Sequence, residues 1–464
     1  MQYLDLEDRK IQEECGVVGI HQVEDAATLC YYGLHSVQHR GQESAGIASS
    51  DGSAISMTKA KGLVTEVFDK QKLERLEPSC QAVGHVRYSS QEDNITENIQ
   101  PIAVRAHQGD FVIVNNGFIV NAKELRYELE EKGSIFHGTS DTEIISHLIQ
   151  RAPGTFIEKI KQACSRLVGA FSLIIMTKNT MYAVRDRHGF RPLAFGRLDN
   201  GYVFASETCS FEIINADFIR DVEPGEIIKH GKQTEGYEST HFAEAEAPKM
   251  CAMEYIYFSR PDSDIDGLNV HAVRKRTGQI IARDDDCEAD IVVGVPDSSL
   301  SAAMGYAEER GLPYEMGIIK NRYIARTFIK PTQKERDRGV KMKLSPVASI
   351  VRDKRVVLLD DSIVRGTTSI RIVQLMREAG AKEVHMRVVS PPLISPCFYG
   401  VDMKSVDQLI AANHSIDELC KILNADSLKY LTVEQLHEAC GDTICDACFT
   451  RDYPTDLYSW SDNI

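Results

Sequence analysis

The chain has no apolar run close to the roughly 20 residues that a helix needs to cross a bilayer, so we expect no membrane-spanning segment. It also lacks a basic excess, because 53 lysines and arginines face 68 aspartates and glutamates, a formal net charge of −15. Such a charge opposes general nucleic-acid binding, which depends on cations that neutralise phosphates. Residues 1–14 are acidic and polar, unlike a secretory signal. These absences favour a cytoplasmic protein without membrane or nucleic-acid partners.

The 464 residues are enough for two to three domains of about 100–200 residues each. Up to residue 229, short runs rich in β-branched or alternating apolar residues predict strands. These runs are 15–20, 46–48, 82–85, 111–114, 171–177, 181–185 and 202–205. Helical patterns cover 122–132 and 141–151, and Ser140 with Glu143 predicts a capping box at the start of the second. The pattern predicts an α+β half with stacked sheets.

After residue 267 the pattern changes to alternating strands and helices. Strands are expected at 291–295, 355–359 and 383–389, and helices at 301–310 and 369–379. This order predicts a parallel sheet with helices on its faces, and ligands then bind at the carboxyl ends of the strands. The tail after residue 402 is typical of short helices.

Two adjacent acids end one of these strands, in the string from Val356 to Thr368. Asp360 and Asp361 can accept hydrogen bonds from two vicinal hydroxyls or help to hold Mg²⁺. The loop from Ser362 to Thr368 then supplies amides, hydroxyls and a helix N-terminus for a phosphate. A lone Asp-Asp pair is more often a turn with a good helix cap, but the whole string indicates a phosphorylated ribose.

A second strand end agrees with the first. Pro296-Asp297-Ser298-Ser299 follows strand 291–295, and its small hydroxyl residues and free amides suit a pyrophosphate. Residues 320–343 carry nine lysines and arginines against two acids. This segment is either a solvated surface loop or a mobile anion-binding loop near the phosphate site.

Twelve cysteines in a chain without a secretory signal favour thiol chemistry or metal binding over disulfides. Cys15 precedes a strand of small residues and, by itself, is typical of a buried structural cysteine. The pair Cys445 and Cys448 could bind zinc, carry redox chemistry or have no function, because two ligands are too few for a closed site. Spacing alone does not identify further ligands among cysteines such as Cys420 and Cys440.

Four polar, glycine-rich stretches (32–46, 84–89, 115–117 and 138–141) resemble the glutaminase domain of class II, N-terminal-nucleophile amidotransferases. The string that contains Asp360 and Asp361 resembles the ribose-phosphate loop of type I phosphoribosyltransferases. Together, from Cys15 to about Leu457, the chain resembles the family of glutamine phosphoribosylpyrophosphate (PRPP) amidotransferases. The resemblance implies a four-layer αββα sandwich and a parallel phosphoribosyltransferase sheet. The implied division is a propeptide at 1–14, a glutaminase domain at 15–245, a transferase domain at 246–405 and a helical tail at 406–464.

This resemblance implies the first committed step of purine synthesis, in which glutamine, PRPP and water give 5-phosphoribosylamine, glutamate and pyrophosphate. It also implies Mg²⁺ with PRPP, feedback inhibition by purine nucleotides, and a homo-oligomer, either a dimer or a tetramer. Ammonia released at one site is expected to reach the other through a channel. The basic segment matches the family's flexible loop, with Ala325 where the family usually has glycine.

The resemblance also gives roles to single residues. Removal of 1–14 would make Cys15 the first residue, and its α-amine, with a pKa near 7.7–8.0, could then act as base to its own thiol. Asn116 and the amide of Gly117 would form the oxyanion hole, although an Asn-Gly turn is the simpler interpretation. Arg87 would bind the α-carboxylate of glutamine, and Asp141 its α-ammonium, unless Asp141 is only part of a helix cap. Arg40 and Tyr88 would order a loop over glutamine and couple the sites.

The implied PRPP and metal ligands complete the set. PRPP would be bound by Lys320, Asp360, Asp361, Ser362, Arg365, Gly366, Thr367 and Thr368, and Mg²⁺ by Ser298, Asp360 and Asp361. One branch of the family carries a structural, oxygen-sensitive [4Fe–4S] cluster, and its ligands match Cys251, Cys397, Cys445 and Cys448. Two alternatives remain: another class II amidotransferase, which Asp360–Thr368 opposes, and a PRPP-sensing DNA regulator, which the net charge and Cys15-Gly16 oppose.

Overall fold

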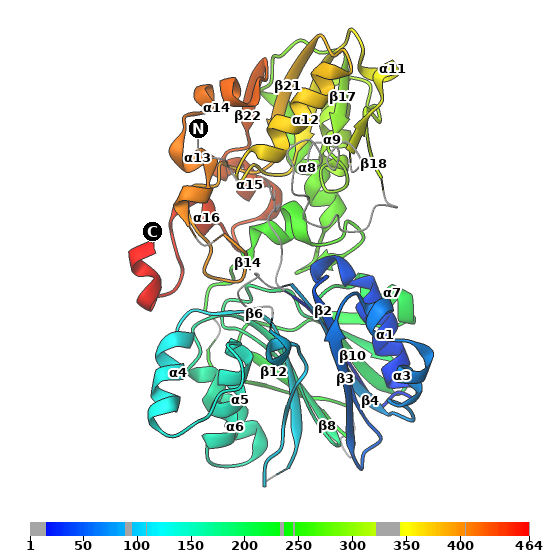
Figure 1. Cartoon of the computed structure of the whole chain (residues 1–464), viewed down its shortest axis with the longest axis vertical. Helices are drawn as coiled ribbons and strands as arrows, with labels where there is room; N and C mark the ends of the chain where they lie inside the picture. The colour runs from blue at the N-terminus through cyan, green and yellow to red at the C-terminus, as the bar shows by residue number, and fades with distance from the viewer. Residues whose placement is uncertain are drawn as a thin grey trace.

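The computed structural model describes residues 15–88, 95–107, 109–232, 236–244, 246–321, 344–403 and 405–463. Two halves are stacked along the long axis of the molecule, a two-sheet sandwich formed by the N-terminal half and a sheet flanked by helices in the C-terminal half (Figure 1). Each half buries its own apolar core. No helix in these segments is both long and apolar enough to span a bilayer.

The first sheet has seven strands in the order β11-β9-β10-β1-β4-β2-β3, and every neighbouring pair is antiparallel. β1 lies in the middle of this sheet, between β10 and β4. The strands are β1 (Cys15–His21), β2 (Ser44–Ser50), β3 (Ile55–Lys61), β4 (Gln81–Arg87), β9 (Ala194–Leu198), β10 (Gly201–Ala205) and β11 (Asp217–Asp221).

The second sheet has six strands in the order β13-β12-β8-β7-β6-β5, also antiparallel throughout. Its strands are β5 (Ile102–Val104), β6 (Phe111–Ile119), β7 (Gly169–Thr177), β8 (Thr180–Arg185), β12 (Glu226–Gly231) and β13 (Glu238–His241). Apolar side chains of both sheets, such as Val17 and Ile174, pack between them in one cluster. The alternation along each strand therefore places one face of each sheet in this shared core.

Helices cover the outer faces of the two sheets. On the first sheet lie α1 (Ala26–Ser36), α7 (Cys209–Ile214) and the short α2 (Val64–Val67) and α3 (Lys70–Glu74). On the second lie α4 (Ala122–Glu131), α5 (Asp141–Arg151) and α6 (Phe156–Ser165). Figure 1 shows both sheets between these helix layers. The αββα sandwich expected from the resemblance is confirmed.

The C-terminal half contains a parallel sheet in the order β17-β20-β21-β22. Its strands are β17 (Ile291–Gly294), β20 (Arg355–Asp360), β21 (Glu383–Val388) and β22 (Ser427–Tyr430). The helices α8 (Val270–Arg283) and α9 (Leu300–Arg310) pack on one face, and α12 (Thr367–Glu378) and α14 (Ile416–Leu423) on the other. Residues 356–359 are fully buried because both faces are covered, which explains their continuous apolar run. The expected parallel sheet is confirmed.

Shorter elements connect the halves. β14 (Met250–Cys251) pairs in parallel with β23 (Ile444–Cys445), and the π-helical turn η4 (Glu254–Phe258) follows β14.

The remaining elements are all short. They are η1 (Gln38–Arg40), η3 (Thr96–Asn98), β15 (Asp264–Ile265), β16 (Leu268–Asn269), β18 (Ile318–Lys320), β19 (Leu344–Pro346), α11 (Ala348–Val351), η5 (Val406–Gln408), α13 (Ile410–Asn413), α15 (Val433–Cys440), α16 (Ala447–Thr450) and η6 (Tyr458–Asn463).

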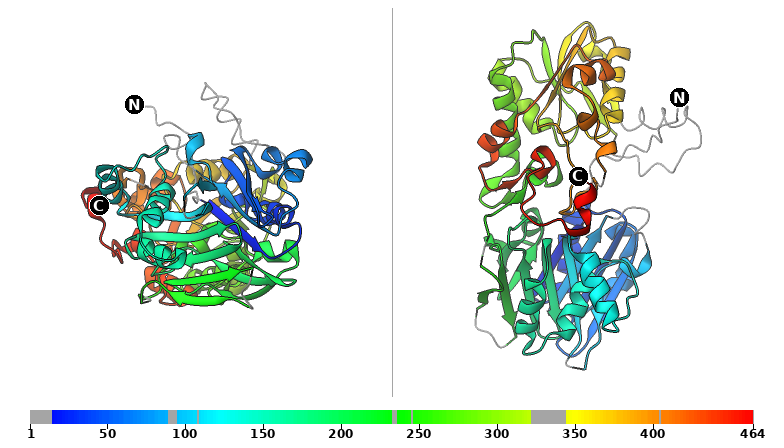
Figure 2. Two further views of the ribbon diagram at one scale, coloured as in Figure 1. Left: turned by 90° about the horizontal axis from the view of Figure 1, so that it is seen from below. Right: turned by 90° about the vertical axis from the view of Figure 1, so that its left-hand side faces the viewer.

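The C-terminal turn η6 lies against the sandwich rather than beside the C-terminal sheet (Figure 2). The indole N–H of Trp460 donates to the carbonyl oxygen of Val120 at 3.2 Å, and its ring packs edge-on against Phe118. The end of the chain therefore ties the two halves together.

The start of α5 differs from its expected form. Ser140 caps the helix by accepting the amide of Thr142 at 3.2 Å, but the predicted capping box is wrong. The Ser140 amide donates to the side chain of Asn98, and the Glu143 carboxylate accepts from the amides of His137 and Gly138. Asn98 thus satisfies the Ser140 amide that a capping box would use. Glu143 instead fixes the segment that leads into the helix.

Candidate functional site

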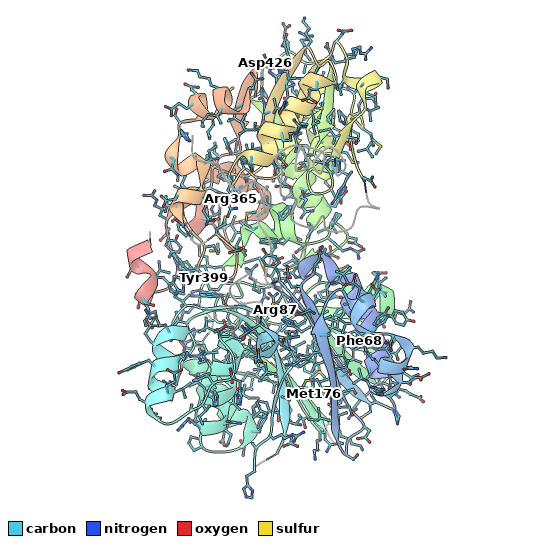
Figure 3. The ribbon with its side chains drawn as sticks, viewed as in Figure 1. Phe68, Arg87, Met176, Arg365, Tyr399 and Asp426 are labelled. Atoms are coloured by element: carbon cyan, nitrogen blue, oxygen red, sulfur yellow. The ribbon has the colours of Figure 1, made fainter. Side chains whose placement is uncertain are left out.

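Cys15 lies at the first position of β1, at the end of the sandwich that faces the other half. Its backbone is directly opposite Arg87 of β4, which is labelled in Figure 3. Cys15 is 6% exposed, and its carbonyl oxygen accepts the Arg40 Nε–H at 3.1 Å. Pairing with β4 and the hydrogen bond from Arg40 hold the Cys15 backbone in place, as a nucleophile requires.

Asn116 and Gly117 lie in β6, which packs across β1 in the facing sheet. Asn116 is fully buried, and within the described residues neither its side-chain oxygen nor its nitrogen has a hydrogen-bond partner. A buried amide without partners costs free energy, so this side chain indicates a ligand site. Gly117 has φ +145°, and a Cβ there would lie 2.2 Å from the Ala170 carbonyl oxygen, so only glycine fits. The pair has the properties of an oxyanion hole, and it lies within a strand rather than a turn.

Asp141 is the first residue of α5, and its carboxylate accepts the amide of Ile119 at 2.9 Å. Burial raises the pKa of Asp141 to about 6, although this hydrogen bond and the nearby Arg87 lower it in part. Because the guanidinium of Arg87 lowers the pKa of Asp141, it lies near the Asp141 carboxylate. A cation and an anion side by side complement the carboxylate and ammonium of an amino acid.

Arg40 is fully buried, and two carboxylates of the protein hold its guanidinium. Nη1 donates to Glu207 Oε1 at 2.7 Å, and Nη2 donates to Glu254 Oε1 at 2.9 Å. The structure thus places Arg40 behind the Cys15 backbone. Tyr88, 7% exposed, directly follows β4, and residues 89–94, which come next, lie outside the described residues.

Asp360 ends β20 and Asp361 follows it, both at the carboxyl edge of the parallel sheet, as predicted. Each is 2% exposed. Asp361 accepts hydrogen bonds from Ser362 Oγ at 3.0 Å and from Ser298 Oγ, which brings the two neighbouring strand ends together. Lys320 Nζ donates to Asp297 at 2.7 Å from the adjacent β18. Carboxylate and hydroxyl oxygens gathered in this way are the hard ligands that Mg²⁺ prefers.

The loop after Asp361 leads into α12. Gly366 is the N-cap in the left-handed region, with φ +77°, and Thr367 and Thr368 form the first helical turn. Arg365 Nη2 donates to Gln408 at 2.9 Å, and Figure 3 shows Arg365 on the side of this half that lies nearer the sandwich. The expected basic loop, including Ala325, falls in residues 322–343, outside the described residues.

Two groups near these sites, Arg274 and Tyr430, were not predicted from the sequence, and a third, Ser299, belongs to the predicted pyrophosphate loop. Arg274 of α8 is buried, and burial lowers its pKa to about 10 while the nearby Asp361 raises it. The Ser299 hydroxyl is buried beside the pyrophosphate loop without a partner in the described residues. Tyr430 ends β22, and its hydroxyl is likewise unpartnered there. Arg274 and Tyr430 carried no sequence signal.

Cys251, Cys397, Cys445 and Cys448 line one cavity at the junction of the halves. Its other lining residues are apolar or aromatic: Phe190, Met253, Pro396, Tyr399, Val401, Met403, Ala447 and Tyr453. The amide of Tyr399, labelled at the junction in Figure 3, donates to Cys397 Sγ at 3.3 Å. Burial raises the pKa of Cys251 to about 12 and those of Cys445 and Cys448 well above their usual value. In the described part of the chain, no three histidine, cysteine or acidic side chains are placed as ligands of one metal ion.

Comparison with known families gives two domain matches. A glutamine amidotransferase domain matches residues 85–212, and a phosphoribosyl transferase domain matches residues 268–391. The first match contains Arg87, Asn116 and Asp141, and the second contains Ser298, Asp360 and Asp361.

Curated relatives match nearly the whole chain. An amidophosphoribosyltransferase of Bacillus subtilis (strain 168) is 49% identical over 97% of this chain and 96% of the relative. One of Staphylococcus aureus (strain MRSA252) is 46% identical over 98% and 93%. A solved B. subtilis glutamine PRPP amidotransferase, described as complexed with ADP and GMP, superposes with a TM-score of 0.92 at 48% identity, covering 97% of this chain and 99% of that chain. A second solved structure, described as the allosteric regulatory enzyme of purine biosynthesis, has a TM-score of 0.93 at 48% identity, covering 97% of this chain and 98% of that chain.

Proposed function

The chain belongs to the amidophosphoribosyltransferase family, and from this we propose how its own residues perform the family's reaction. The enzyme catalyses the first step of purine biosynthesis, converting glutamine, PRPP and water to 5-phosphoribosylamine, glutamate and pyrophosphate. The sandwich supplies nitrogen from glutamine, and the parallel sheet transfers it to the ribose.

In the sandwich, Arg87 and Asp141 bind the carboxylate and the ammonium of glutamine. The Cys15 thiolate attacks the side-chain amide, and Asn116 with the Gly117 amide stabilises the oxyanion. Ammonia leaves, and water releases glutamate from the thioester. The α-amine of Cys15 acts as the base, so the reaction requires cleavage between Glu14 and Cys15, because an amide nitrogen is no base.

In the parallel sheet, Asp360 and Asp361 bind the ribose hydroxyls of PRPP, and the loop from Ser362 to Thr368 surrounds the 5′-phosphate. Lys320 and the loop around Ser298 hold the pyrophosphate. Ser298, Asp360 and Asp361 would hold Mg²⁺, which supplies charge neutralisation for the leaving pyrophosphate. Ammonia attacks C1 of the ribose as pyrophosphate departs.

The observation that carries this function is the buried Asn116 amide on the strand that packs across the strand of Cys15, unpartnered among the described residues, in a chain that also places Asp360 and Asp361 at a sheet edge. The test measures glutamate release with and without Mg-PRPP on anaerobically purified protein, with pyrophosphate recorded alongside. Strong stimulation by PRPP with matched glutamate and pyrophosphate supports the proposal. Glutamate release at the same rate with and without PRPP, with no pyrophosphate formed, would overturn the proposed function.

We assign the chain to the processed, cluster-bearing branch of the family. The support is that four cysteines from three separate regions line one apolar cavity, with an amide donated to one sulfur as is common around iron–sulfur sites. Cys251, Cys397, Cys445 and Cys448 would hold a [4Fe–4S] cluster, which supplies a structural cross-link there. Since burial opposes bare thiolates, the cations of the cluster would balance the sulfur charges.

We expect anaerobically purified protein to contain close to four iron and four sulfide per chain, with a visible absorption band that air bleaches. Cys448→Ser should lose this iron, whereas Cys420→Ser, a half-buried cysteine outside the cavity, should retain it. Zinc in place of iron, or equal iron in both variants, would contradict the assignment.

Glutamine binding should weaken below about pH 6. Burial raises the pKa of Asp141 to about 6, and the protonated carboxyl loses its attraction for the glutamine ammonium. The KM for glutamine should therefore rise about tenfold per pH unit below that value, while ammonia-dependent synthesis follows a different pH profile. The effect on the free energy of unfolding has the opposite sign. A raised pKa of Asp141 stabilises the folded protein at low pH, and that stabilisation is lost as the pH rises through about 6. A pH-independent KM between 5 and 7 would exclude this role.

Several broader assignments remain part of the proposal. Purine nucleotides inhibit, as the ADP and GMP in the relative's complex suggest. The protein is a cytoplasmic homo-oligomer, a dimer or tetramer, and the described residues contain no disulfide, as suits a reducing compartment. The functional division is 1–14, 15–245, 246–405 and 406–464.

A further inference from the structure

Four charged side chains meet at the junction of the halves with almost no exposure. Arg40, Arg191 and Glu207 belong to the sandwich, and their side chains are at most 1% exposed, as is that of Glu254. Glu254 begins the turn η4, whose neighbours Met253, Tyr255 and Ile256 are buried in the core of the C-terminal half. The C-terminal half thus inserts one carboxylate into the back of the sandwich.

Both oxygens of Glu254 are fully used. Oε1 accepts from Arg40 Nη2 at 2.9 Å and from Arg191 Nη1 at 3.1 Å. Oε2 accepts from Arg40 Nη1 at 3.1 Å and from Ser259 Oγ at 2.6 Å. The Arg40–Glu254 pair is therefore bidentate, which fixes the plane of the guanidinium as well as its position.

The third nitrogen of the same guanidinium, Nε, donates to the Cys15 carbonyl oxygen at 3.1 Å. One rigid, planar group thus connects Glu254 to the backbone of the nucleophile. Glu207 accepts from Arg40 as well, and although burial alone would raise its pKa, His39 and Arg40 hold it well below its usual range. The sandwich therefore supplies one charged partner for Arg40, and the C-terminal half supplies the other.

The turn that carries Glu254 is also tied toward the PRPP site. Arg274 of α8 donates through Nε to the Tyr255 carbonyl at 2.7 Å and through Nη2 to the Ser259 carbonyl at 2.8 Å. Arg274 also lies close enough to Asp361 for that carboxylate to raise its pKa. The described residues thus connect Asp361 to Arg274, the η4 turn, Glu254, Arg40 and the Cys15 carbonyl.

We propose that Glu254 is a positioning residue for the nucleophile. By fixing Arg40, and through it the carbonyl of Cys15, this carboxylate lets the transferase half set the alignment of the thiol for attack. The inference rests on the proposed function. It goes beyond that function because Glu254 is not among the residues assigned to either substrate and belongs to the other half of the chain.

Glu254→Gln tests the proposal. The amide keeps the shape but offers only one acceptor oxygen to two guanidinium groups. We expect kcat with glutamine to fall on the order of 10²-fold, as small misplacements of reacting groups do. Ammonia-dependent synthesis should stay within about twofold of wild type, since Asp360 and Asp361 are intact. The rate of Cys15 alkylation by a glutamine analogue should fall as well, and PRPP should no longer stimulate it.

Glu226→Gln is the matched control, because Glu226 is also buried and forms a bidentate pair with Arg220 at 2.6 and 2.7 Å in the sandwich. Equal losses with glutamine and ammonia, an unchanged rate with glutamine, or the same pattern in Glu226→Gln would overturn the proposal. If Glu254→Gln does not fold, Ser259→Ala tests the proposal instead. This change removes the hydrogen bond that Ser259 donates to Glu254 Oε2 and leaves every charge in place. The proposal then requires a smaller loss of activity that affects the glutamine-dependent reaction and not the ammonia-dependent one. Failure of the wild type to couple glutamate release to PRPP would instead overturn the proposed function.

Discussion

Cys15→Ala should abolish synthesis from glutamine while synthesis from ammonia continues. Loss of a nucleophile costs on the order of 10³-fold or more in rate, because no other group in the site can form the thioester. The parallel sheet and its ligands lie in the other half, so PRPP binding and attack by added ammonia are retained. The measurement compares pyrophosphate release with glutamine and with ammonium chloride at pH 8.5.

Cys80→Ser is the control for this variant, since Cys80 is half-buried just before β4 and outside the site. It should leave both activities near wild type. A second comparison uses chain in which residues 1–14 are retained, and it should behave like Cys15→Ala. Substantial glutamine-dependent activity in either Cys15→Ala or the uncleaved chain would refute the nucleophile assignment.

Asp361→Asn should remove both activities together, by at least about 10²-fold, which is the reverse of the nucleophile variant's selectivity. The change deletes one of two adjacent carboxylates and weakens the bond that Ser298 donates across the two strand ends. Mg-PRPP affinity, measured by calorimetry, should fall in parallel.

Asp353→Asn is suited as the control, because Asp353 is exposed just before β20 and has φ +59°, which asparagine also adopts readily. It should bind Mg-PRPP like the wild type. The assignment of Asp361 fails if its variant keeps normal affinity, or if it loses only the glutamine-dependent reaction.

Local sequence patterns were sufficient to predict the structure where the functional residues and the helix or strand that carries them lie in one short stretch of the chain. The apolar run before Asp360 is a buried parallel strand, and its end places both acids at the sheet edge, so motif and geometry agree. α5 spans the predicted 141–151 because its cap and apolar spacing are local. The patterns did not predict α1, α6, α8 or the strand β22. α1 contains Gly33, which allows close packing on Val18, and β22 has only four residues, so neither gives a clear local period.

The network behind Cys15 could not be predicted for a different reason. Glu207 and Glu254 lie 167 and 214 residues from Arg40 along the chain. Neither carboxylate has a local sequence neighbour that reveals its partner, and a glutamate normally signals an exposed position. Only the packing of two separately folded halves brings these charges together, so their role is a property of the whole chain.

The last two dozen residues are needed to complete the fold. β23 completes the short parallel pair with β14, and Trp460, the only tryptophan, binds the sandwich through Val120. Every proposed catalytic and substrate-binding residue precedes α13, so a prematurely terminated polypeptide would carry all of them and still leave the cysteine cavity open and its aromatic walls bare. Such a product would expose apolar side chains that the complete chain covers. The segment through β23 and Trp460 is therefore needed to close the junction between the two halves.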